Sequence, residues 1–366
     1  QNSQRFALKT QHLLAGKFVY ALVEKDSLGN QLSTAPIAVN IREKDKLTVM
    51  MVNQFPSFET KYLKNFLAES GHQVLVRSQV SKERFKYEYF NTSQRGSISL
   101  SAKTLSEIDL LIIDAVSLKK ASRRLLSLLK TAIEKEGLGV FVQVEADMFK
   151  GTIPLLELVF LKQDDKKTFL DNDPMTSLSK QPYVCKEGPL VETVHKSPKG
   201  ILTAYSRAGA GRIGTTVLEN TYELILEGQV ESYQVLWSKL ISSISKRKAL
   251  ETVWTQNEPI AYQDNPFHFQ ITTNQENPSL SHEAGYKIPL ARDMNLEECW
   301  SGTVFPREPG WNKLIMTHDS TEVFDFYVMD TAQWASVGIA KRMSENRKYF
   351  KEQQSSITRS MSLRPI

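Results

Sequence analysis

Three short runs of almost uninterrupted apolar residues constrain the fold of this chain more than any other feature. They are LTVMMVN (47–53), IDLLIIDAV (108–116) and GVFVQV (139–144). A strand that is buried on both faces has this pattern, whereas a strand with one solvent-facing side alternates. Segments with one apolar helical face, 58–67 and 118–136, lie between the runs. The alternation predicts an α/β domain with a mostly parallel, doubly wound sheet.

Start and stop signals place further helices and strands around these runs. Ser57 and Gly71 bound the first predicted helix, because serine is a favoured N-cap and glycine ends helices. The apolar face of this helix is expected to include Phe58. A long helix is also predicted over 229–245, with Val230 among its inward-facing residues. The other predicted strands are 72–80, 154–161, 200–208 and 212–218, and the polar segment 162–182 is interpreted as a loop.

The residue patterns at the two ends of the chain are typical of antiparallel β structure. Residues 17–24 and 34–42 flank the turn-forming segment DSLGN, which predicts a hairpin. Because an isolated hairpin is marginal in water, it either ends a β-domain that begins upstream or is completed by the C-terminal region. From Leu250 to 330, short aromatic strands separated by Gly, Pro and Asn predict a β-sandwich. Residues 331–352 are expected to form a terminal helix, and the final residues no regular structure.

Four segments follow from these patterns. They are a β-hairpin (1–44), an α/β domain (45–247), a β-sandwich-like domain (248–330) and a terminal helix with a basic tail (331–366). A length of 366 residues agrees with two or three domains. Hydrophobic residues make up 41% and charged residues 24%, which excludes a wholly disordered chain. No run reaches the roughly 18 apolar residues of a membrane-spanning helix.

The positive charge of the chain is concentrated at its C-terminal end. From Lys341 onward there are seven basic and two acidic residues; removing these from totals of 46 and 41 leaves 39 of each in the body. A nucleic-acid-binding protein is expected to carry a basic stripe on a folded face, and the neutral body predicts none. The tail is interpreted as a solvated helix and end, with attraction to an acidic surface as the alternative.

The motifs of common catalytic and cofactor sites are missing or lie in the wrong context. Residues 209–214 read GAGRIG, but a strand follows where a dinucleotide-binding motif needs a helix, so a hairpin turn is predicted. None of the six histidines is paired at the spacing of a metal site, and no metal or cofactor is expected. Cys185 and Cys299 lie outside any strand-to-helix turn that would present a nucleophile, and both are interpreted as ordinary cysteines.

Polar residues follow the apolar runs at the edge where open α/β sheets bind ligands. The candidate ligand crevice consists of Asn53, Ser57, Glu59, Asp114, Glu145 and Asp147. Each also has an alternative role: Ser57 as a helix cap, Asp114 as a helix-start residue and Glu145 as a solvated side chain. The sequence leaves open whether this edge is a ligand crevice or a set of caps.

Five stretches of the α/β region together resemble the class I glutamine amidotransferase-like fold. They are VMMVNQFPSFETKYLKNFLAESGHQVLVRSQV, LSEIDLLIIDAV, LLKTAIEKEGLGVFVQV, GAGRIGTTVLENTYEL and SYQVLWSKLISSIS. More closely, they are similar to the degenerate form found in bacterial membrane-anchored proteins of unknown function. The likeness covers about 45–245, and PGWNKL with FYV extends it to about 330. The resemblance implies a flavodoxin-like sheet flanked by Ig-like β-sandwich segments at both ends.

The resemblance also implies that the catalytic groups of the family are absent. Amidotransferases have a cysteine after the strand that is 139–144 here, where this chain has Val144 and Glu145. Their histidine and acid fall in a stretch represented here by GTTVLEN, with Leu218 near the histidine position and Asn220 close by. Without a thiolate or an imidazole, glutamine hydrolysis has neither nucleophile nor base. A pseudoenzyme is therefore expected.

The function implied is a non-catalytic scaffold or recognition region of a bacterial membrane protein, on its extracytoplasmic, periplasmic side. Its partners would be other membrane or envelope proteins, with no nucleic acid, and membrane attachment would come from segments beyond this sequence. Two alternatives remain. One is a hydrolase or amidase that uses carboxylates such as Asp114, Glu145 and Asp147. The other is a carbohydrate- or protein-binding β-module with an aromatic contact surface at Trp300 and Trp311.

Overall fold

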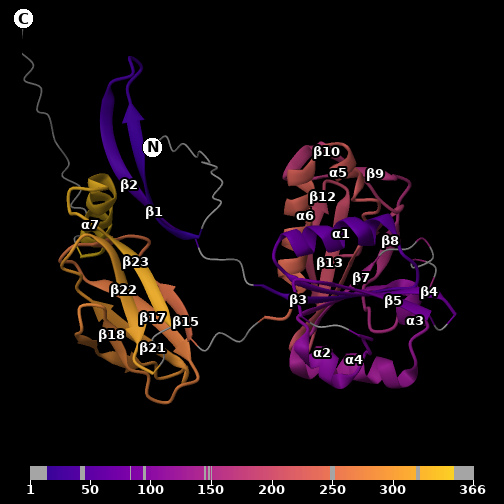
Figure 1. Ribbon diagram of the computed structural model, residues 1–366. Helices are drawn as coiled ribbons and strands as arrows, with labels where there is room; N and C mark the ends of the chain where they lie inside the picture. The colour runs from indigo at the N-terminus through magenta and orange to yellow at the C-terminus, as the bar shows by residue number, and fades with distance from the viewer. Residues whose placement is uncertain are drawn as a thin grey trace, which may run out of the picture. The chain divides into compact units, whose positions relative to one another are not determined.

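The computed structural model divides the chain into two compact units, which Figure 1 shows with their elements labelled. The α/β unit comprises Asp45–Lys248, and the β unit comprises Gln1–Lys44 together with Ala249–Ile366. The β unit thus unites the first, third and fourth of the segments expected from the sequence. The structure describes residues 15–41, 46–82, 84–93, 96–143, 146, 149, 151–247, 252–318 and 322–349.

A ten-stranded mixed sheet forms the centre of the α/β unit. Five adjacent strands are parallel, in the order β4 (Gln73–Ser81), β3 (Thr48–Asn53), β6 (Leu110–Asp114), β7 (Gly139–Gln143) and β14 (Gly211–Thr216). The antiparallel strands are β5 (Arg84–Phe90) beside β4, and β13 (Gly200–Ala208), β11 (Tyr183–Cys185), β8 (Phe160–Lys162) and β12 (Val191–Ser197) beyond β14. The predicted α/β class is confirmed, but the sheet is mixed and not mostly parallel, because four of its strand pairings are parallel and five are antiparallel.

Two apolar cores cover the two faces of this sheet. In β3, Val49 and Met51 belong to one core and Met50 and Val52 to the other, because successive side chains of a strand point to opposite faces. The first core includes side chains from α1 (Phe58–Glu69) and α6 (Val230–Ile244). The second includes side chains from α2 (Ala102–Glu107), α3 (Ala115–Lys119) and α4 (Arg123–Glu136). This double burial explains the continuous apolar runs of the sequence.

Two predicted inward-facing residues are exposed instead. Phe58 and Val230 are 64% and 42% exposed, respectively. Both are the first residue of their helix. The helix predicted over 118–136 is interrupted, with α3 ending at Lys119 before α4 begins at Arg123.

Two segment predictions between 154 and 182 were wrong. The strand predicted over 154–161 begins only at Phe160, because Leu155 adopts a left-handed backbone conformation (φ +68°) that no strand accommodates. The predicted loop 162–182 contains a hairpin, β9 (Lys167–Leu170) with β10 (Asp173–Ser179). Its strands are largely solvent-exposed, which explains their polar sequence. The antiparallel edge strand β5 was likewise not predicted.

The GAGRIG segment forms the hairpin turn expected from the sequence. Ala208 pairs with Gly211 across the turn between β13 and β14. Glycine is required here by close packing: a Cβ on Gly211 would lie 2.5 Å from the carbonyl oxygens of Ile133 and Leu138. The motif therefore packs a hairpin against the end of α4 and does not open a helix for a dinucleotide.

In the β unit, two sheets share one core. The first sheet has the order β15 (Thr252–Gln256), β17 (Phe267–Thr273), β21 (Cys299–Val304) and β20 (Leu290–Arg292). The second has the order β16 (Ala261–Tyr262), β23 (Val323–Met329), β22 (Gly310–Met316), β18 (Leu280–His282) and β19 (Lys287–Ile288). Phe269 and Ile271 from the first sheet and Leu314 and Val328 from the second belong to this core.

The N-terminal hairpin, β1 (Gly16–Lys25) and β2 (Gln31–Ile41), is attached to the C-terminal part of the same unit. Lys17 Nζ lies 2.6 Å from Asp325 Oδ1 of β23, and Trp334 Nε1 donates a hydrogen bond of 2.8 Å to Pro36 O. The hairpin, which forms a two-stranded sheet of its own, thus packs against the C-terminal region.

A terminal helix, α7 (Ala335–Tyr349), occupies most of the range expected for it. The predicted irregular end of the chain lies outside the described residues. Of the helices in the described part of the chain, none combines the length and the apolar character needed to cross a bilayer.

Candidate functional site

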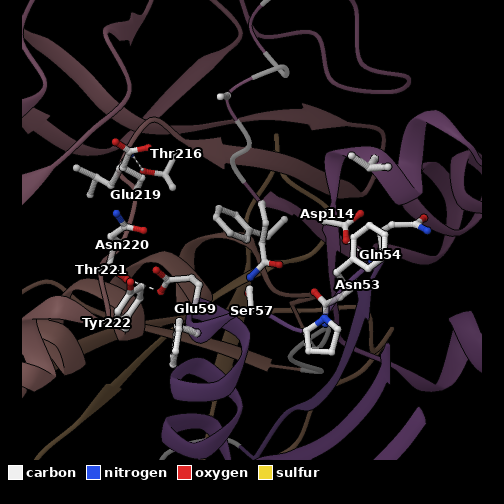
Figure 2. A pocket seen from close by; sticks show the side chains of 18 of the residues that line it. Asn53, Gln54, Ser57, Glu59, Asp114, Thr216, Glu219, Asn220, Thr221 and Tyr222 are labelled. Atoms are coloured by element: carbon white, nitrogen blue, oxygen red, sulfur yellow. Dashed lines mark hydrogen bonds between the residues drawn. The ribbon is translucent and has the colours of Figure 1, made fainter. Parts of the chain in front are cut away.

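A cavity of about 660 Å³ opens at the carboxyl ends of the parallel strands of the α/β unit. Its volume lies within the range of about 300–1,000 Å³ that is typical of small-molecule sites. Figure 2 shows the polar side chains that line it. The polar lining residues among those described are Asn53, Gln54, Ser57, Glu59, Asp114, Gln143, Gln181, Thr216, Glu219, Asn220, Thr221 and Tyr222.

The cavity brings together the described members of the candidate crevice. Asn53, Ser57, Glu59 and Asp114 all line it. Glu145 and Asp147 lie outside the described residues, as does Val144. Of the other expected catalytic positions, Leu218 and Asn220 line the same cavity. The carboxyl ends of adjacent parallel strands meet at one edge, which explains why residues so distant in sequence converge.

Two of these residues cap helices and so have their polar atoms occupied. Ser57 Oγ accepts a hydrogen bond of 3.1 Å from Thr60 N at the start of α1. Asp114 Oδ1 accepts one of 2.6 Å from Ser117 N at the start of α3, and its Oδ2 accepts a hydrogen bond from Gln54 N. The capping roles weighed from the sequence are confirmed for both, and these caps fix the walls of the cavity.

Glu59 differs from Asp114 because one of its carboxylate oxygens remains unoccupied. Thr221 Oγ1 donates a hydrogen bond of 2.6 Å to Glu59 Oε1, and Trp237 Nε1 in turn donates one of 2.9 Å to Thr221 Oγ1 (Figure 2). Glu59 Oε2 is buried and has no hydrogen-bond partner among the described residues. Burial raises the pKa of Glu59, and hydrogen bonds from Thr221 and from the backbone of Tyr222 only partly offset this effect.

Two amide groups at the cavity are also unpaired. Asn53 Oδ1 accepts a hydrogen bond of 3.2 Å from Thr60 Oγ1, but Asn53 Nδ2 is buried without a partner in the described part of the chain. The same holds for Gln143 Nε2 at the end of β7. Asn53 is 3% exposed and Gln143 9%. Each unpaired buried donor costs on the order of 1–3 kcal/mol, so this arrangement is not explained by stability.

Aromatic residues form one rim of the cavity. Phe55 and Phe58 both line it, and they are 67% and 64% exposed. The Tyr222 ring, also part of the lining, lies 5.6 Å from the Phe58 ring and is stacked on Tyr62 at 5.7 Å between centroids. Buried apolar side chains, Phe141, Leu218 and Trp237, also line the cavity, and a mixture of apolar and polar lining is usual in a ligand site.

The charge of the lining is acidic. Glu59, Asp114 and Glu219 contribute carboxylates, and the described lining contains no Lys, Arg, His or Cys. Glu219 Oε2 accepts a hydrogen bond from Gln181 Nε2, so its position is also fixed. A site of this kind offers nothing to neutralise a phosphate or a carboxylate ligand.

Gln143, Thr221 and Trp237 are site residues that sequence reasoning did not identify. Gln143 carried a weak signal, since it is a polar residue at the end of an apolar strand. Thr221 follows β14 in a loop, and Trp237 belongs to the buried face of α6, so neither carries a sequence signal of its own.

Neither cysteine lies at the cavity. Cys185 is buried at the end of β11, and burial alone raises the pKa of its thiol to about 12. Cys299 is a free cysteine in β21 of the β unit, with its Sγ 3.4 Å from Thr272 Oγ1. Among the described residues, no group of three or more His, Cys, Asp or Glu side chains is arranged to hold a metal ion.

The expected aromatic contact surface is only partly open. Trp300 is half-buried against the core of the β unit, with Arg292 5.7 Å from its ring. Trp311 is half-buried beside Tyr327, with Lys17 5.5 Å from its ring. Neither ring lies fully in the core, and a cation covers each, so the surface remains a prediction.

Comparisons with known proteins identify no family for this chain. No family model matches it, and no curated protein does. Among solved structures, it is similar to an exo-β-1,4-mannosidase from Opitutaceae bacterium strain TAV5, at 14% identity and a TM-score of 0.35, over 56% of this chain and 37% of that one. A cytoplasmic protein from Salmonella typhimurium matches at 11% identity and a TM-score of 0.37, over 55% of this chain and 100% of that one.

A catalytic mutant of a GH42 β-galactosidase from G. stearothermophilus matches at 11% identity and a TM-score of 0.31, over 71% of this chain and 40% of that one. This chain thus spans well under half the length of the two glycosidases. Likenesses this distant carry no argument about function.

Proposed function

We propose that this chain is a non-catalytic recognition region of a bacterial membrane protein, and that it binds a small polar ligand in the cavity of its α/β unit. The extracytoplasmic location and the partners among envelope proteins rest on the resemblance to degenerate amidotransferase-like proteins. The ligand site rests on one observation: three buried polar atoms of the cavity lack partners among the described residues. Buried polar groups are normally hydrogen-bonded, and a bound ligand would supply what is missing here.

The order of the strands in the sheet supports a flavodoxin-like fold for the α/β unit. The parallel strands lie in the order β4-β3-β6-β7-β14, which is the 2-1-3-4-5 order of flavodoxin-like sheets. In such sheets ligands bind outside the carboxyl ends of the strands, where the order reverses between the first and third strands. Asn53 ends β3 and Asp114 ends β6, and both line the cavity. The packed sheets at the other end of the chain are the part we assign as Ig-like.

The residues at the expected catalytic positions support a loss of amidotransferase chemistry. Leu218, which stands near the position of the family's histidine, is buried and lines the cavity. The sequence has Val144 and Glu145 where the family has its cysteine. Leucine and valine supply neither a nucleophile nor a base, and Glu145 does not replace the thiol in amide hydrolysis.

One observation favours the alternative of a carboxylate-dependent hydrolase. Glu59 has a raised pKa inside a cavity, which is typical of general acids and bases. Such an enzyme also needs a second carboxylate with a different pKa. Asp114 is a poor candidate, because both of its oxygens accept backbone hydrogen bonds.

Incubation of the full chain with glutamine, followed by measurement of released ammonia, tests the proposal against this alternative. We expect no release above the buffer rate, and no difference between the wild type and Cys185→Ser. Turnover that Cys185→Ser or Glu59→Gln abolishes would contradict the non-catalytic assignment. The same two variants thus distinguish a thiol mechanism from a carboxylate mechanism.

A further inference from the structure

From the chemistry of the unpaired atoms, we infer that the ligand of the cavity is a neutral polyhydroxyl compound, namely a sugar ring. This inference rests on the proposed ligand site and names the class of compound that the site accepts. The unpaired atoms are two amide donors, Asn53 Nδ2 and Gln143 Nε2, and one carboxylate acceptor, Glu59 Oε2. A hydroxyl group both donates and accepts, so neighbouring hydroxyls on one ring satisfy both kinds of partner.

The Glu59 acceptor is held in place before a ligand arrives. The buried hydrogen bonds from Trp237 to Thr221 and from Thr221 to Glu59 fix one carboxylate oxygen and leave Oε2 in a defined position. Asn53 is fixed through the oxygen side of its amide by Thr60, which leaves its NH₂ group free to donate. Groups that are fixed in advance bind a ligand without the entropic cost of ordering them.

The charge of the lining argues against anionic ligands. A phosphate or carboxylate group is normally held by Arg, Lys or a free helix N-terminus. The described lining has no basic side chain, and the helix starts at α1 and α3 are occupied by their own caps, Ser57 and Asp114. Nucleotides and free amino acids, which carry such groups, therefore do not fit the site.

The aromatic rim fits the apolar face of a sugar ring. Phe55 and Phe58 are exposed beside the cavity, and Tyr222 lies against Phe58. The C–H groups on one face of a pyranose pack on aromatic rings, while its hydroxyls point outward along the ring edge. The cavity thus combines exposed aromatic side chains with a few placed polar groups, a composition that suits a ring with an apolar face and polar hydroxyls.

Titration calorimetry of the 366-residue chain with a panel of probes tests this inference. The panel consists of D-glucose, D-galactose, D-mannose and N-acetylglucosamine, with putrescine, glutamine and inorganic phosphate for comparison. We expect saturable binding of at least one sugar and none of phosphate or glutamine. Gln143→Met should weaken that binding about tenfold or more, since it removes one buried hydrogen bond to the ligand, and Glu59→Gln should weaken it as much, since it replaces a charged acceptor by a neutral amide.

Matched variants outside the cavity serve as controls. Glu69→Gln changes an exposed carboxylate at the other end of α1, and Gln73→Met changes an exposed amide at the start of β4. Both should bind the sugar as the wild type does. Thermal unfolding of every variant checks that loss of binding is not loss of fold.

The possible outcomes distinguish a failure of the sugar assignment from a failure of the proposed ligand site. Binding of putrescine but of no sugar, weakened by Glu59→Gln, would overturn the sugar assignment and keep the ligand site. Absence of binding by every probe would overturn the sugar assignment and remove support from the site itself. A sugar that binds equally well to Glu59→Gln, Gln143→Met and the controls would place binding elsewhere and contradict the inference.

Discussion

The amino ends and the carboxyl ends of the parallel strands in the α/β unit differ in how many of their polar atoms have hydrogen-bond partners. At the amino ends, Asp109 is fully engaged: its carboxylate accepts a 2.8 Å hydrogen bond from Thr48 N, and its carbonyl oxygen accepts bonds from Gly139 N and Lys246 N. At the carboxyl ends, Glu59, Asn53 and Gln143 each keep one atom unpaired among the described residues. Exceptions at the amino ends are Arg212, whose Nε is unpaired although its Nη1 bonds to Ser245 O, and Glu136, whose Oε2 is unpaired just before β7.

The two ends of the strands also differ in how tightly they are packed. A Cβ added at Gly139, at the start of β7, would lie 2.2 Å from Ile244 O, so backbone closes this end of the sheet. The other end holds a cavity of about 660 Å³. The same strands thus end in a closed layer on one side and at an open cavity on the other. This contrast supports the proposed ligand site at the carboxyl ends.

The largest expected effect comes from filling the closed end. Gly211→Ala would place a methyl group 2.5 Å from two backbone oxygens, and overpacking of this kind should cost about 3 kcal/mol of unfolding free energy. Gly151→Ala is the control, since nothing lies within 4 Å of its added Cβ, and it should change stability by less than about 0.5 kcal/mol. Chemical unfolding measures both, and equal midpoints would contradict the tight packing of this end.

A second test concerns His195, a titratable residue buried in the antiparallel part of the sheet. Burial lowers its pKa from 6.5 to about 4, so the folded state favours the neutral ring. Its contribution to stability is therefore complete above pH 6.5 and is lost as the pH falls toward 4, by about 3 kcal/mol. His195→Gln should lose less stability than the wild type between pH 7 and pH 4.5. Identical pH profiles would show that the ring is accessible to protons in the folded state.

Glu59 should show the opposite pH dependence, because burial raises its pKa above the ordinary value of 4.5. As the pH rises past 4.5, the unfolded chain ionises first, so the folded state loses stability until Glu59 itself ionises. Glu59→Gln should therefore gain stability relative to the wild type, and the gain should grow as the pH rises from 4 toward neutrality. Urea unfolding at several pH values measures it.

The smallest effect is expected for Gln143→Met. This change removes an unpaired buried amide and keeps the length of the side chain, so stability should stay the same or rise by up to about 1 kcal/mol. A loss of more than about 1 kcal/mol would mean that the amide has a protein partner, which would weaken the contrast between the two ends.

The core of the fold could be predicted from the sequence because its signals are local. Continuous apolar runs such as 47–53 and 108–116 identify strands buried on both faces. The hairpin β9–β10 escaped prediction because its strands are short and mostly polar, as loops are. The edge strand β5 (RFKYEYF) alternates charged and aromatic residues, so its sequence did carry a strand signal that was overlooked. The attachment of β1 and β2 to β23 could be raised only as one possibility, since it joins residues about 300 positions apart, such as Lys17 and Asp325.

The candidate site was predicted in part, for the same reason. Asn53, Ser57, Glu59 and Asp114 could be identified because each follows or caps an element with a clear boundary. Thr221 could not, since it meets Glu59 across 162 positions of sequence from a loop with no local signal. Whether a buried polar atom has a hydrogen-bond partner depends on all the residues around it in the fold. The spacing of residues along the sequence therefore cannot predict it.

A crystal structure of the full chain grown with the sugar that binds it best tests the central claim most directly. We predict density for one sugar ring in the cavity at the carboxyl ends of β3, β6 and β7, with hydroxyls bonded to Asn53 Nδ2 and Glu59 Oε2 and an aromatic side chain of the rim against its face. A structure in which side chains of the protein itself fill the cavity and pair with Asn53, Gln143 and Glu59 would contradict the account.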